Sequence, residues 1–293
     1  MSQASTVPPS PRSGDAPRLA HAVSVDAHEG PVYAADEHAL YFTSVPRPGE
    51  AAPVVDIKRL DLASGEVTVL VPDARTANGM ALGHDGALVV CEQGTFTLPA
   101  AIARIDRVTG ERATVVDAPL NSPNDVVVKS DGTIWFTDPS YGWLQGFRPE
   151  PAGSDGVYRY DPRTGDLALV ADSFDKPNGL CFSPGETTLY VGDNGEPQHV
   201  KAFDVIDGSS LARERVLAQI GPGHPDGMKV DAQGRLYVSS PGGVGVLSPA
   251  GVALDEIGLP GAVNFCFGGP DYDVLFITTD TAIQAAHLQV KGS

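Results

Sequence analysis

The chain contains a short strand pattern that recurs six times, and this repeat constrains the fold more than any other feature. Each copy begins with an oxygen-bearing side chain, followed in five copies by glycine or aspartate, and continues as a short apolar run. The copies begin at Glu29, Asn78, Asn124, Asn178, Asp226 and Asn264, with spacings of 49, 46, 54, 48 and 38 residues. Repeats of this length are typical of propellers and solenoids.

The third copy shows how one unit is built. Residues 126–128 and 133–136 are two apolar runs joined by Ser130-Asp131-Gly132, a sequence that favours a tight hairpin turn. Farther along, several units carry a second hairpin, for example residues 102–106 turning at Thr109-Gly110. Two hairpins make a four-stranded blade, and six such blades make a propeller. We therefore predict an all-β fold, a six-bladed β-propeller with four-stranded blades and helices only in short connections.

The two ends of the chain predict how the ring closes. After the sixth inner hairpin only one strand-like run remains, residues 283–290, so the last blade lacks its outer strand. The N-terminal run, residues 19–25, has no partner within the first unit. Pairing these two runs would close the ring and protect both edges. We expect residues 1–18 to form a flexible N-terminal tail and residues 19–293 to form a single propeller domain.

The charge of the chain narrows its partners. The formal net charge is −17, which disfavours binding to nucleic acid or to anionic membranes. No apolar run approaches the ~18 residues that span a membrane, and residues 1–14 are Ser/Pro-rich without a continuous apolar core. The three cysteines lie in apolar strand-like runs, which favours buried, inert thiols. We expect a cytoplasmic protein, a monomer or weak homo-oligomer, that acts on a small molecule and binds neither nucleic acid nor membranes.

If the six units surround one axis, their opening residues converge at one end of it. All six can offer oxygen, and carboxylate and amide oxygens are hard ligands suited to Ca²⁺, Mg²⁺ or Mn²⁺. The openings provide no sulfur ligand and no paired histidines, which argues against a structural zinc site. Asn, Asp and Gly also open strands simply because they suit turns. The spacing alone therefore leaves metal binding open.

Other polar and aromatic side chains are expected near the same end. Asp138 ends the second strand of the third unit, where it is placed to accept a proton from a metal-associated water. The alternative is a carboxylate that ties down its own loop. Glu92 occupies the corresponding position in the second unit. The long connection after Asp138 carries Tyr141 and Trp143, which are typical of a pocket wall or of a surface loop that packs its own rings. His28 and His224 lie near the same rim as candidates for substrate contact, but neither has the spacing of a catalytic triad.

Several motifs together resemble the senescence-marker-protein/gluconolactonase/regucalcin family, and the resemblance runs from about residue 19 to the C-terminus. They occur in matching order: His28-Glu29-Gly30-Pro31, Asn121-Ser122-Pro123-Asn124-Asp125, Phe136-Thr137-Asp138-Pro139, Pro177-Asn178-Gly179-Leu180, Pro225-Asp226-Gly227-Met228-Lys229-Val230-Asp231 and Cys266-Phe267-Gly268-Gly269. The motif Asn121-Ser122-Pro123-Asn124-Asp125, with Phe136-Thr137-Asp138-Pro139 following it, is similar to bacterial gluconolactonases in particular. The resemblance implies a six-bladed propeller that holds a divalent cation near its axis and hydrolyses sugar lactones.

The resemblance also implies roles for individual residues. The metal ligands would be Glu29, Asn124, Asn178 and Asp226. Asn78 and Asn264 occupy matching ring positions but are not usual ligands in the family. Candidates for substrate binding are Asp125, Glu92, Tyr141, Trp143 and His224. The implied cofactor is one divalent metal ion, with Ca²⁺ expected and Zn²⁺, Mn²⁺, Mg²⁺ or Fe²⁺ as alternatives.

Two departures from the family bear on the substrate. Gln93-Gly94 follows Glu92, where many relatives have His-Gly and basic residues. Pro123 precedes Asn124, where the regucalcin branch commonly has arginine. Both positions concern contacts to the sugar more than contacts to the metal.

The leading hypothesis is metal-dependent hydrolysis of a sugar lactone of the gluconolactone type to its aldonic acid, with Asp226 and Asp138 as the catalytic residues. The ion would polarise the lactone carbonyl and lower the pKa of a bound water. Two alternatives stay open. One is hydrolysis of phosphotriesters or aryl esters in the same pocket, and the other is a non-catalytic calcium-binding propeller scaffold.

Overall fold

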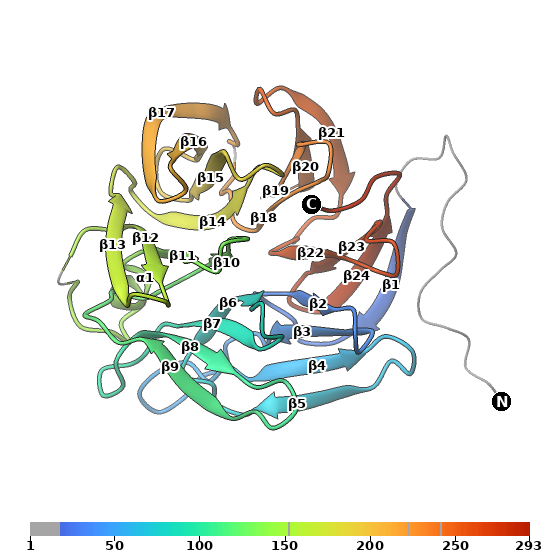
Figure 1. The fold of residues 1–293 in the computed structure, drawn as a ribbon. Coiled ribbons are helices and arrows are strands. Elements are labelled where there is room, and N and C mark those ends of the chain that lie inside the picture. The colour runs from blue at the N-terminus through green and yellow to red at the C-terminus, as the bar shows by residue number, and fades with distance from the viewer. Residues whose placement is uncertain (1–17, 152, 222, 241) are drawn as a thin grey trace.

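The computed structural model describes residues 18–151, 153–221, 223–240 and 242–293. Within them, six four-stranded antiparallel sheets surround a central axis as blades, as Figure 1 shows. The predicted all-β, six-bladed propeller is confirmed. The tail expected over residues 1–18 lies outside the described residues except for Arg18, which begins β1.

The blades follow one another around the axis in chain order. Within each of the first five blades, the strands also follow chain order, from the innermost strand to the outermost. Blade 1 comprises β2 (Val32–Ala34), β3 (Ala39–Thr43), β4 (Ile57–Asp61) and β5 (Val67–Val71). Blade 2 comprises β6 (Ala77–Leu82), β7 (Leu88–Glu92), β8 (Ala101–Ile105) and β9 (Arg112–Val116). Blade 3 comprises β10 (Val126–Val128), β11 (Ile134–Asp138), β12 (Gly156–Asp161) and β13 (Asp166–Ala171). Blade 4 comprises β14 (Pro177–Phe182), β15 (Thr188–Asp193), β16 (His199–Ile206) and β17 (Ser210–Gln219). Blade 5 comprises β18 (Met228–Val230), β19 (Leu236–Ser240), β20 (Gly243–Leu247) and β21 (Ala253–Gly258). Blade 6 comprises β22 (Phe265–Gly268), β23 (Val274–Thr278) and β24 (Ala282–His287), with β1 (Arg18–Ser24) as its outer strand.

The inner hairpins are set by their turn chemistry. In the β10–β11 hairpin, Val126 pairs with Phe136. The Asp131 carboxylate accepts hydrogen bonds from the backbone N–H and the hydroxyl of Thr133, at 3.0 and 2.7 Å. Gly132 has φ of +85°, a conformation that favours glycine. Because the turn fixes the register, the residues before β10 and after β11 lie together at one end of the blade.

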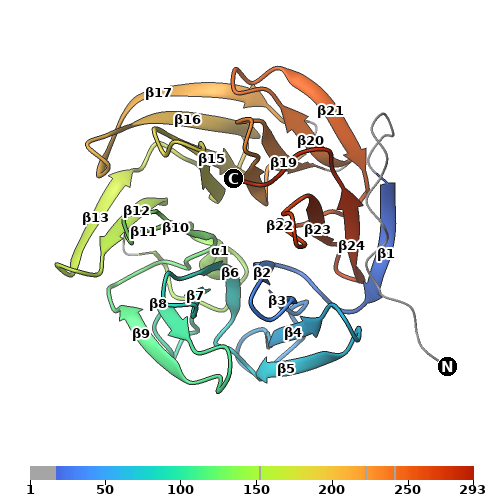
Figure 2. The ribbon, with the colours of Figure 1, turned by 45° about the vertical axis from the view of Figure 1, so that its right-hand side comes forward.

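The ring is closed by strands from the two ends of the chain. β1 pairs antiparallel with β24, from Arg18 opposite His287 to Ser24 opposite Ala282. Figure 2 shows β1 at the outer edge of the last blade, beside β24. The predicted closure is therefore confirmed, and it supplies the outer strand that blade 6 lacks.

The apolar core lies between neighbouring blades. For example, Trp135 of blade 3 packs in one cluster with Leu180 and Phe203 of blade 4, and each is at most 3% exposed. The three cysteines are free and buried, as their apolar surroundings predicted. In the described part of the chain, no helix is long and apolar enough to cross a membrane. This packing holds the innermost strands β2, β6, β10, β14, β18 and β22 around the axis.

Candidate functional site

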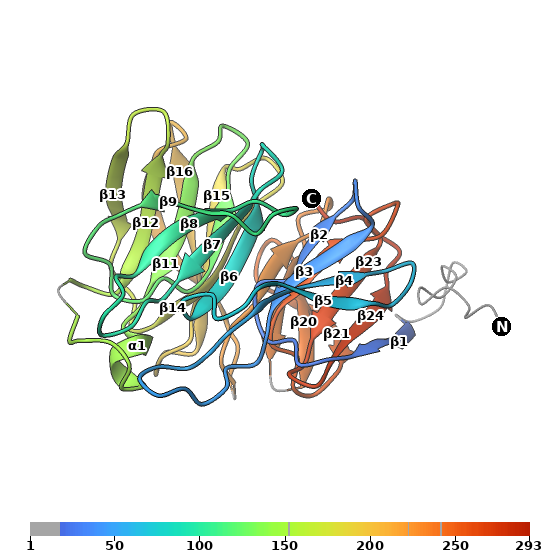
Figure 3. The same ribbon diagram turned by 90° about the horizontal axis from the view of Figure 1, so that it is seen from below.

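A cavity of about 250 Å³ lies at the end of the axis where the inner strands begin. Its walls include five of the six predicted strand openings, Glu29, Asn78, Asn124, Asn178 and Asp226. The short helix α1 (Tyr141–Leu144) follows β11 at this end of the ring, as Figure 3 shows. Tyr141 and Phe147 from this connection line the cavity, and Phe147 is 3% exposed. The ring geometry thus brings together side chains that are far apart in sequence.

Glycine allows the strand openings to approach one another. A Cβ atom on Gly79 would lie 2.5 Å from the carbonyl oxygen of Asn124, and one on Gly227 would lie 2.5 Å from Oδ1 of Asn264. The Gly79 N–H donates to that same Asn124 carbonyl at 2.8 Å. Neighbouring inner strands therefore meet backbone to backbone at their openings. The glycine that follows four of the six opening residues serves this close approach, and turn preference alone does not account for it.

Glu29 is held in place by the last blade. Its Oε2 accepts a hydrogen bond from the Asn264 side-chain amide at 2.6 Å and from the Gly30 N–H at 3.3 Å. Asn264 uses its own Oδ1 to accept the Phe265 N–H at 2.7 Å. Glu29 is 5% exposed and Asn264 is 2% exposed. Asn264 thus orients a site carboxylate across the point of ring closure and does not itself line the cavity.

Asp226 is the second carboxylate of the cavity. Its Oδ1 is buried and has no hydrogen-bond partner among the described residues. Burial raises the pKa of Asp226 well above its usual range, and the neighbouring charge of Glu29 raises it further. Two close, desolvated carboxylates are costly unless a proton or a cation balances their charge. This pair therefore has the electrostatic character of a cation site.

The donor set fits a divalent cation that prefers oxygen. Glu29 and Asp226 offer carboxylate oxygens, and Asn124 and Asn178 offer amide oxygens from the same cavity wall. The described residues contain no cluster of three or more His, Cys, Asp or Glu side chains that could hold a metal. A site of this composition would therefore depend on its two amides as well as its two carboxylates.

Asp125 lies behind this wall and does not line the cavity. It is 2% exposed, its Oδ1 accepts the Val126 N–H at 2.9 Å, and its Oδ2 has no partner among the described residues. Burial raises its pKa to about 6, while the charge of Lys229 opposes the rise. Its backbone N–H donates to the Thr137 hydroxyl at 3.0 Å. This placement favours a role in supporting the Asn124 segment over direct contact with substrate.

Asp138 also lies outside the cavity wall. Its two oxygens accept the backbone N–H groups of Asn121 and Ser122, both at 2.8 Å, and it is 1% exposed. Burial raises its pKa to about 7, although both N–H groups favour the charged form. The structure therefore supports the interpretation that Asp138 ties down its own loop, and Asp138 is not among the described residues that line the cavity.

Three further predicted residues are likewise absent from the cavity wall. Glu92 is 2% exposed and forms a two-pronged ion pair with Arg112, with both N–O distances 2.6 Å. Trp143 is 46% exposed. His224 is exposed, and its Nδ1 lies 2.9 Å from the carbonyl oxygen of Asn194. Of the predicted substrate-binding residues, only Tyr141 lines the cavity. Its buried hydroxyl has no hydrogen-bond partner in the described part of the chain.

Two further residues help to shape the site: His28, which the sequence places near this rim, and Arg148, which it does not single out. His28 lines the cavity, and its Nδ1 lies 2.6 Å from the carboxylate of Asp280. Arg148 donates hydrogen bonds to the carbonyl oxygens of Leu120 and Asn121 at 2.9 Å and of Thr95 at 3.0 Å. It therefore ties two loops of blades 2 and 3 to the connection that carries α1. An arginine within a long loop was the one available signal, and its partners are not evident from sequence.

The fold and the site define the class of protein: a closed propeller with a cavity of carboxylates and amides on its axis. The chain belongs to the SMP-30/Gluconolactonase/LRE-like family, whose pattern matches residues 27–281. The match covers all six strand openings and the connection that carries α1.

Two of the proteins that are similar in sequence are named as lactonases. A gluconolactonase from Zymomonas mobilis subsp. mobilis is 37% identical over 66% of this chain and 58% of its own length. This chain therefore spans less than two thirds of that relative. A pentonolactonase from Haloferax volcanii is 29% identical over 86% of this chain and 80% of its own length. Among solved structures, a gluconolactonase from Xanthomonas campestris superposes with a TM-score of 0.81 at 33% identity, covering 96% of this chain and 99% of that one.

Proposed function

We propose that this protein hydrolyses a sugar lactone of the gluconolactone type to the corresponding aldonic acid, with a divalent cation, Ca²⁺ first among the candidates. The observation that carries the proposal is the pair of neighbouring carboxylates Glu29 and Asp226, which lines the axial cavity together with Asn124 and Asn178. The names of the relatives, which include gluconolactonase and pentonolactonase, support the substrate class.

Four residues would hold the ion: Glu29, Asn124, Asn178 and Asp226. A divalent cation bound there supplies a Lewis acid that polarises the lactone carbonyl. Two carboxylates balance the two positive charges, and the neutral amides complete the donor set without adding negative charge. Asn264 holds Glu29 in the orientation that this role requires, through its 2.6 Å hydrogen bond.

The remaining chemistry belongs to side chains of the cavity wall. We assign proton acceptance to Asp226, because its Oδ1 is unpartnered among the described residues and it lines the cavity. Water adds to the lactone carbonyl and gives a proton to Asp226. The ring C–O bond then breaks, and the leaving oxygen takes up a proton to become the hydroxyl of the open acid. We do not assign this step to Asp138, because its two oxygens are already bound to loop N–H groups.

The pocket wall suits a small cyclic ester. Phe147 and Tyr141 present aromatic surface, and Gln93 and Gln145 offer amide groups for sugar hydroxyls. Gln93 stands where many family members have histidine. We therefore expect hydroxyl recognition by neutral amides and not by basic side chains.

The test is acid release from gluconolactone by chelator-treated protein, with and without added Ca²⁺, Mn²⁺, Mg²⁺, Zn²⁺ or Fe²⁺. We expect turnover only after a metal is restored, and loss of turnover in Asp226→Ala. Asp271→Ala is a matched control, since Asp271 is exposed and its ion-pair partner among the described residues is the exposed Lys291. Full activity without metal would contradict the metal role. Hydrolysis of aryl esters or phosphotriesters, with no hydrolysis of lactones, would contradict the proposed substrate class. The absence of turnover with every metal would favour a non-catalytic scaffold.

A further inference from the structure

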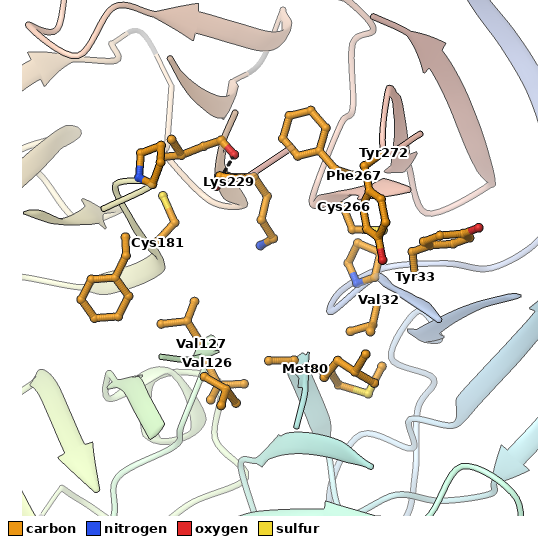
Figure 4. Close-up of a pocket in the computed structure, with 18 of the residues that line it drawn as sticks. Val32, Tyr33, Met80, Val126, Val127, Cys181, Lys229, Cys266, Phe267 and Tyr272 are labelled. Atoms are coloured by element: carbon orange, nitrogen blue, oxygen red, sulfur yellow. Dashed lines mark hydrogen bonds between the residues drawn. The ribbon is translucent and has the colours of Figure 1, made fainter. Parts of the chain in front are cut away.

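A second cavity, of about 370 Å³, lies at the opposite end of the axis from the proposed lactone site. Figure 4 shows this opening, with side chains from the inner strands directed into it. Each of the six inner strands contributes to its wall, and the residues at matching positions of the six strands are Val32, Ala81, Val127, Cys181, Lys229 and Cys266. The lactonase proposal uses none of them.

Five of these six residues are uncharged and the sixth is lysine. All six occupy paired positions of the inner hairpins; for example, Val127 pairs with Trp135 and Lys229 pairs with Tyr237. Phe182 and Phe267 add aromatic surface to the same wall. Blade 5 therefore places a single ammonium group where the other blades place apolar or thiol side chains.

The Lys229 ammonium is not neutralised by a neighbouring carboxylate. It donates a hydrogen bond to the Met228 carbonyl oxygen at 3.0 Å, and no carboxylate oxygen of the described residues lies within 4.0 Å of it. Figure 4 shows its side chain extending into the opening. The one side-chain carboxylate on the described wall, Glu186, is already bound by the Ser130 N–H at 2.7 Å and by Lys129 at 3.3 Å.

An unpaired cation is unusual in this chain, because its formal net charge is −17. Other lysines lie against carboxylates, as Lys58 does against Asp26 at 2.5 Å and Lys201 against Glu214 at 2.6 Å. The charge of Lys229 does oppose the rise in the pKa of buried Asp125. Long-range attraction to Asp125 is thus the alternative explanation for a lysine at this position.

We propose that this second cavity binds a small organic monocarboxylate with an aliphatic or aromatic body. The ammonium of Lys229 would pair with the carboxylate, and the apolar ring would contact the hydrocarbon. A phosphate would leave acceptor oxygens unmatched, since the wall offers one cation and few donors. A sugar acid would bury hydroxyl groups against valine, phenylalanine and thiol surface, which is unfavourable. The site is thus distinct in chemistry from the lactone site and does not depend on the proposed lactonase activity.

The test uses the full-length protein labelled with ¹³C at its methionine methyl groups. The chain has three methionines, and Met80 lines the second cavity while Met228 is buried in the core. Hexanoate, benzoate, hexan-1-ol and gluconate are titrated separately, in the presence of Ca²⁺ and again with chelator. The Met80 signal, assigned from Met80→Leu, reports this cavity and not the metal site.

We expect hexanoate and benzoate to shift the Met80 signal saturably, with or without metal. The affinity for hexan-1-ol should be lower than that for hexanoate by about tenfold or more, because the alcohol cannot form an ion pair with the ammonium. Gluconate should leave the Met80 signal unchanged. Saturable binding of hexan-1-ol at the same affinity as hexanoate would overturn the proposal, and so would the absence of a saturable shift with either carboxylate. In the second case, Lys229 would serve only to offset Asp125.

Substitutions of Lys229 test whether its charge contributes to carboxylate binding. Lys229→Met should weaken hexanoate binding about tenfold or more, whereas Lys229→Arg keeps the charge and should retain binding. Lys291→Met is the control, since Lys291 is 62% exposed and pairs with Asp271 away from this wall. Equal hexanoate affinity in Lys229→Met and wild type would overturn the proposal. If Lys229→Met does not fold, the comparison of hexanoate with hexan-1-ol on the wild-type protein decides.

Discussion

The two ends of the central axis are built from the same six inner strands but present opposite kinds of side chain. At one end, Glu29 and Asp226 face each other among asparagine amides. At the other end, two or three residues farther along each strand, the wall is valine, alanine and cysteine with Lys229 as its one cation among the described wall residues. A few residues of strand thus separate a surplus of negative charge from an unpaired positive charge.

This difference shows how a propeller divides its tasks. The inner strand of each blade is short, so its opening residue and its later residues reach opposite mouths of the axis. Packing between blades involves residues such as Trp135 and Leu180. The apolar mouth shares Val32, Cys181 and Cys266 with this packing. Each mouth can therefore carry its own chemistry on a common frame. The changes below test what maintains the polar mouth, from the largest expected effect to the smallest.

Asp226→Asn removes one of the two charges that define the polar mouth. We expect kcat/KM for lactone hydrolysis to fall about 10²-fold or more, because a catalytic proton acceptor is lost. In chelator, the melting temperature should rise, because a buried carboxylate with a raised pKa no longer faces Glu29. Lactone turnover and thermal unfolding of the same preparations measure both effects. Near-normal turnover, with Asp271→Asn as the exposed control, would contradict the assignment.

Gly79→Ala tests the backbone contact that brings the strand openings together. Its new Cβ would lie 2.5 Å from the Asn124 carbonyl oxygen. We expect the free energy of unfolding to fall by about 1–3 kcal/mol, as for other overpacked sites. Gly185→Ala is the matched control, since nothing lies within 4 Å of its added Cβ. Urea denaturation of both variants gives the comparison, and equal stability would show that the strands can separate at no cost.

Local patterns in the sequence were sufficient to predict the ring. The Asp131-Gly132 turn acts within one hairpin, so its chemistry is readable from adjacent residues and sets the register. The spacing of hairpins then predicted six blades, and the unpaired terminal runs predicted closure by β1 and β24. Convergence of the strand openings follows from this geometry. This geometry predicts all six openings at one end of the axis, and five of them line the cavity. The choice of Glu29, Asn124, Asn178 and Asp226 as ligands came from the family resemblance.

The remaining details of the site depend on partners that are distant in sequence. The hydrogen bond from Asn264 to Glu29 joins residues 235 positions apart. The close approach at Gly79 is between blades, so the same Asn-Gly dipeptide looks like an ordinary turn in the sequence. Asp138 ends its strand at the predicted level, but its orientation depends on the Asn121 N–H that it accepts. The position of a residue in its strand predicts where its side chain lies along the axis. It predicts less reliably which atoms that side chain contacts.

Arg148→Met tests the wall of the polar mouth. Arg148 donates to carbonyl groups of two loops, which would otherwise lack these charged donors. We expect the free energy of unfolding to fall by about 1.5 kcal/mol, and KM for lactone to rise more than kcat falls. Arg163→Met is the control, because Arg163 is 72% exposed and pairs with Asp161 on an outer hairpin. An unchanged KM would mean that the α1 connection holds its position without Arg148.

Asp138→Asn separates the two interpretations of this carboxylate through the pH dependence of stability. An unfolded aspartate ionises near pH 4, whereas burial raises the pKa of folded Asp138 to about 7. Between these values the folded state binds more protons than the unfolded state, so stability falls as the pH rises. The slope from this one group is up to about 1.4 kcal/mol per pH unit between about pH 4 and 7.

The amide that replaces the carboxylate in this variant cannot ionise, so this part of the slope should disappear. Urea denaturation in chelator across that pH range measures it, with Asp271→Asn as the exposed control. At the same time, lactone turnover by metal-loaded Asp138→Asn should fall mainly through a raised KM, because the loop at Asn121 and Ser122 loses one acceptor for its N–H groups. A collapse of kcat with KM unchanged would instead identify Asp138 as the proton acceptor, and Asp226 would then serve the metal alone.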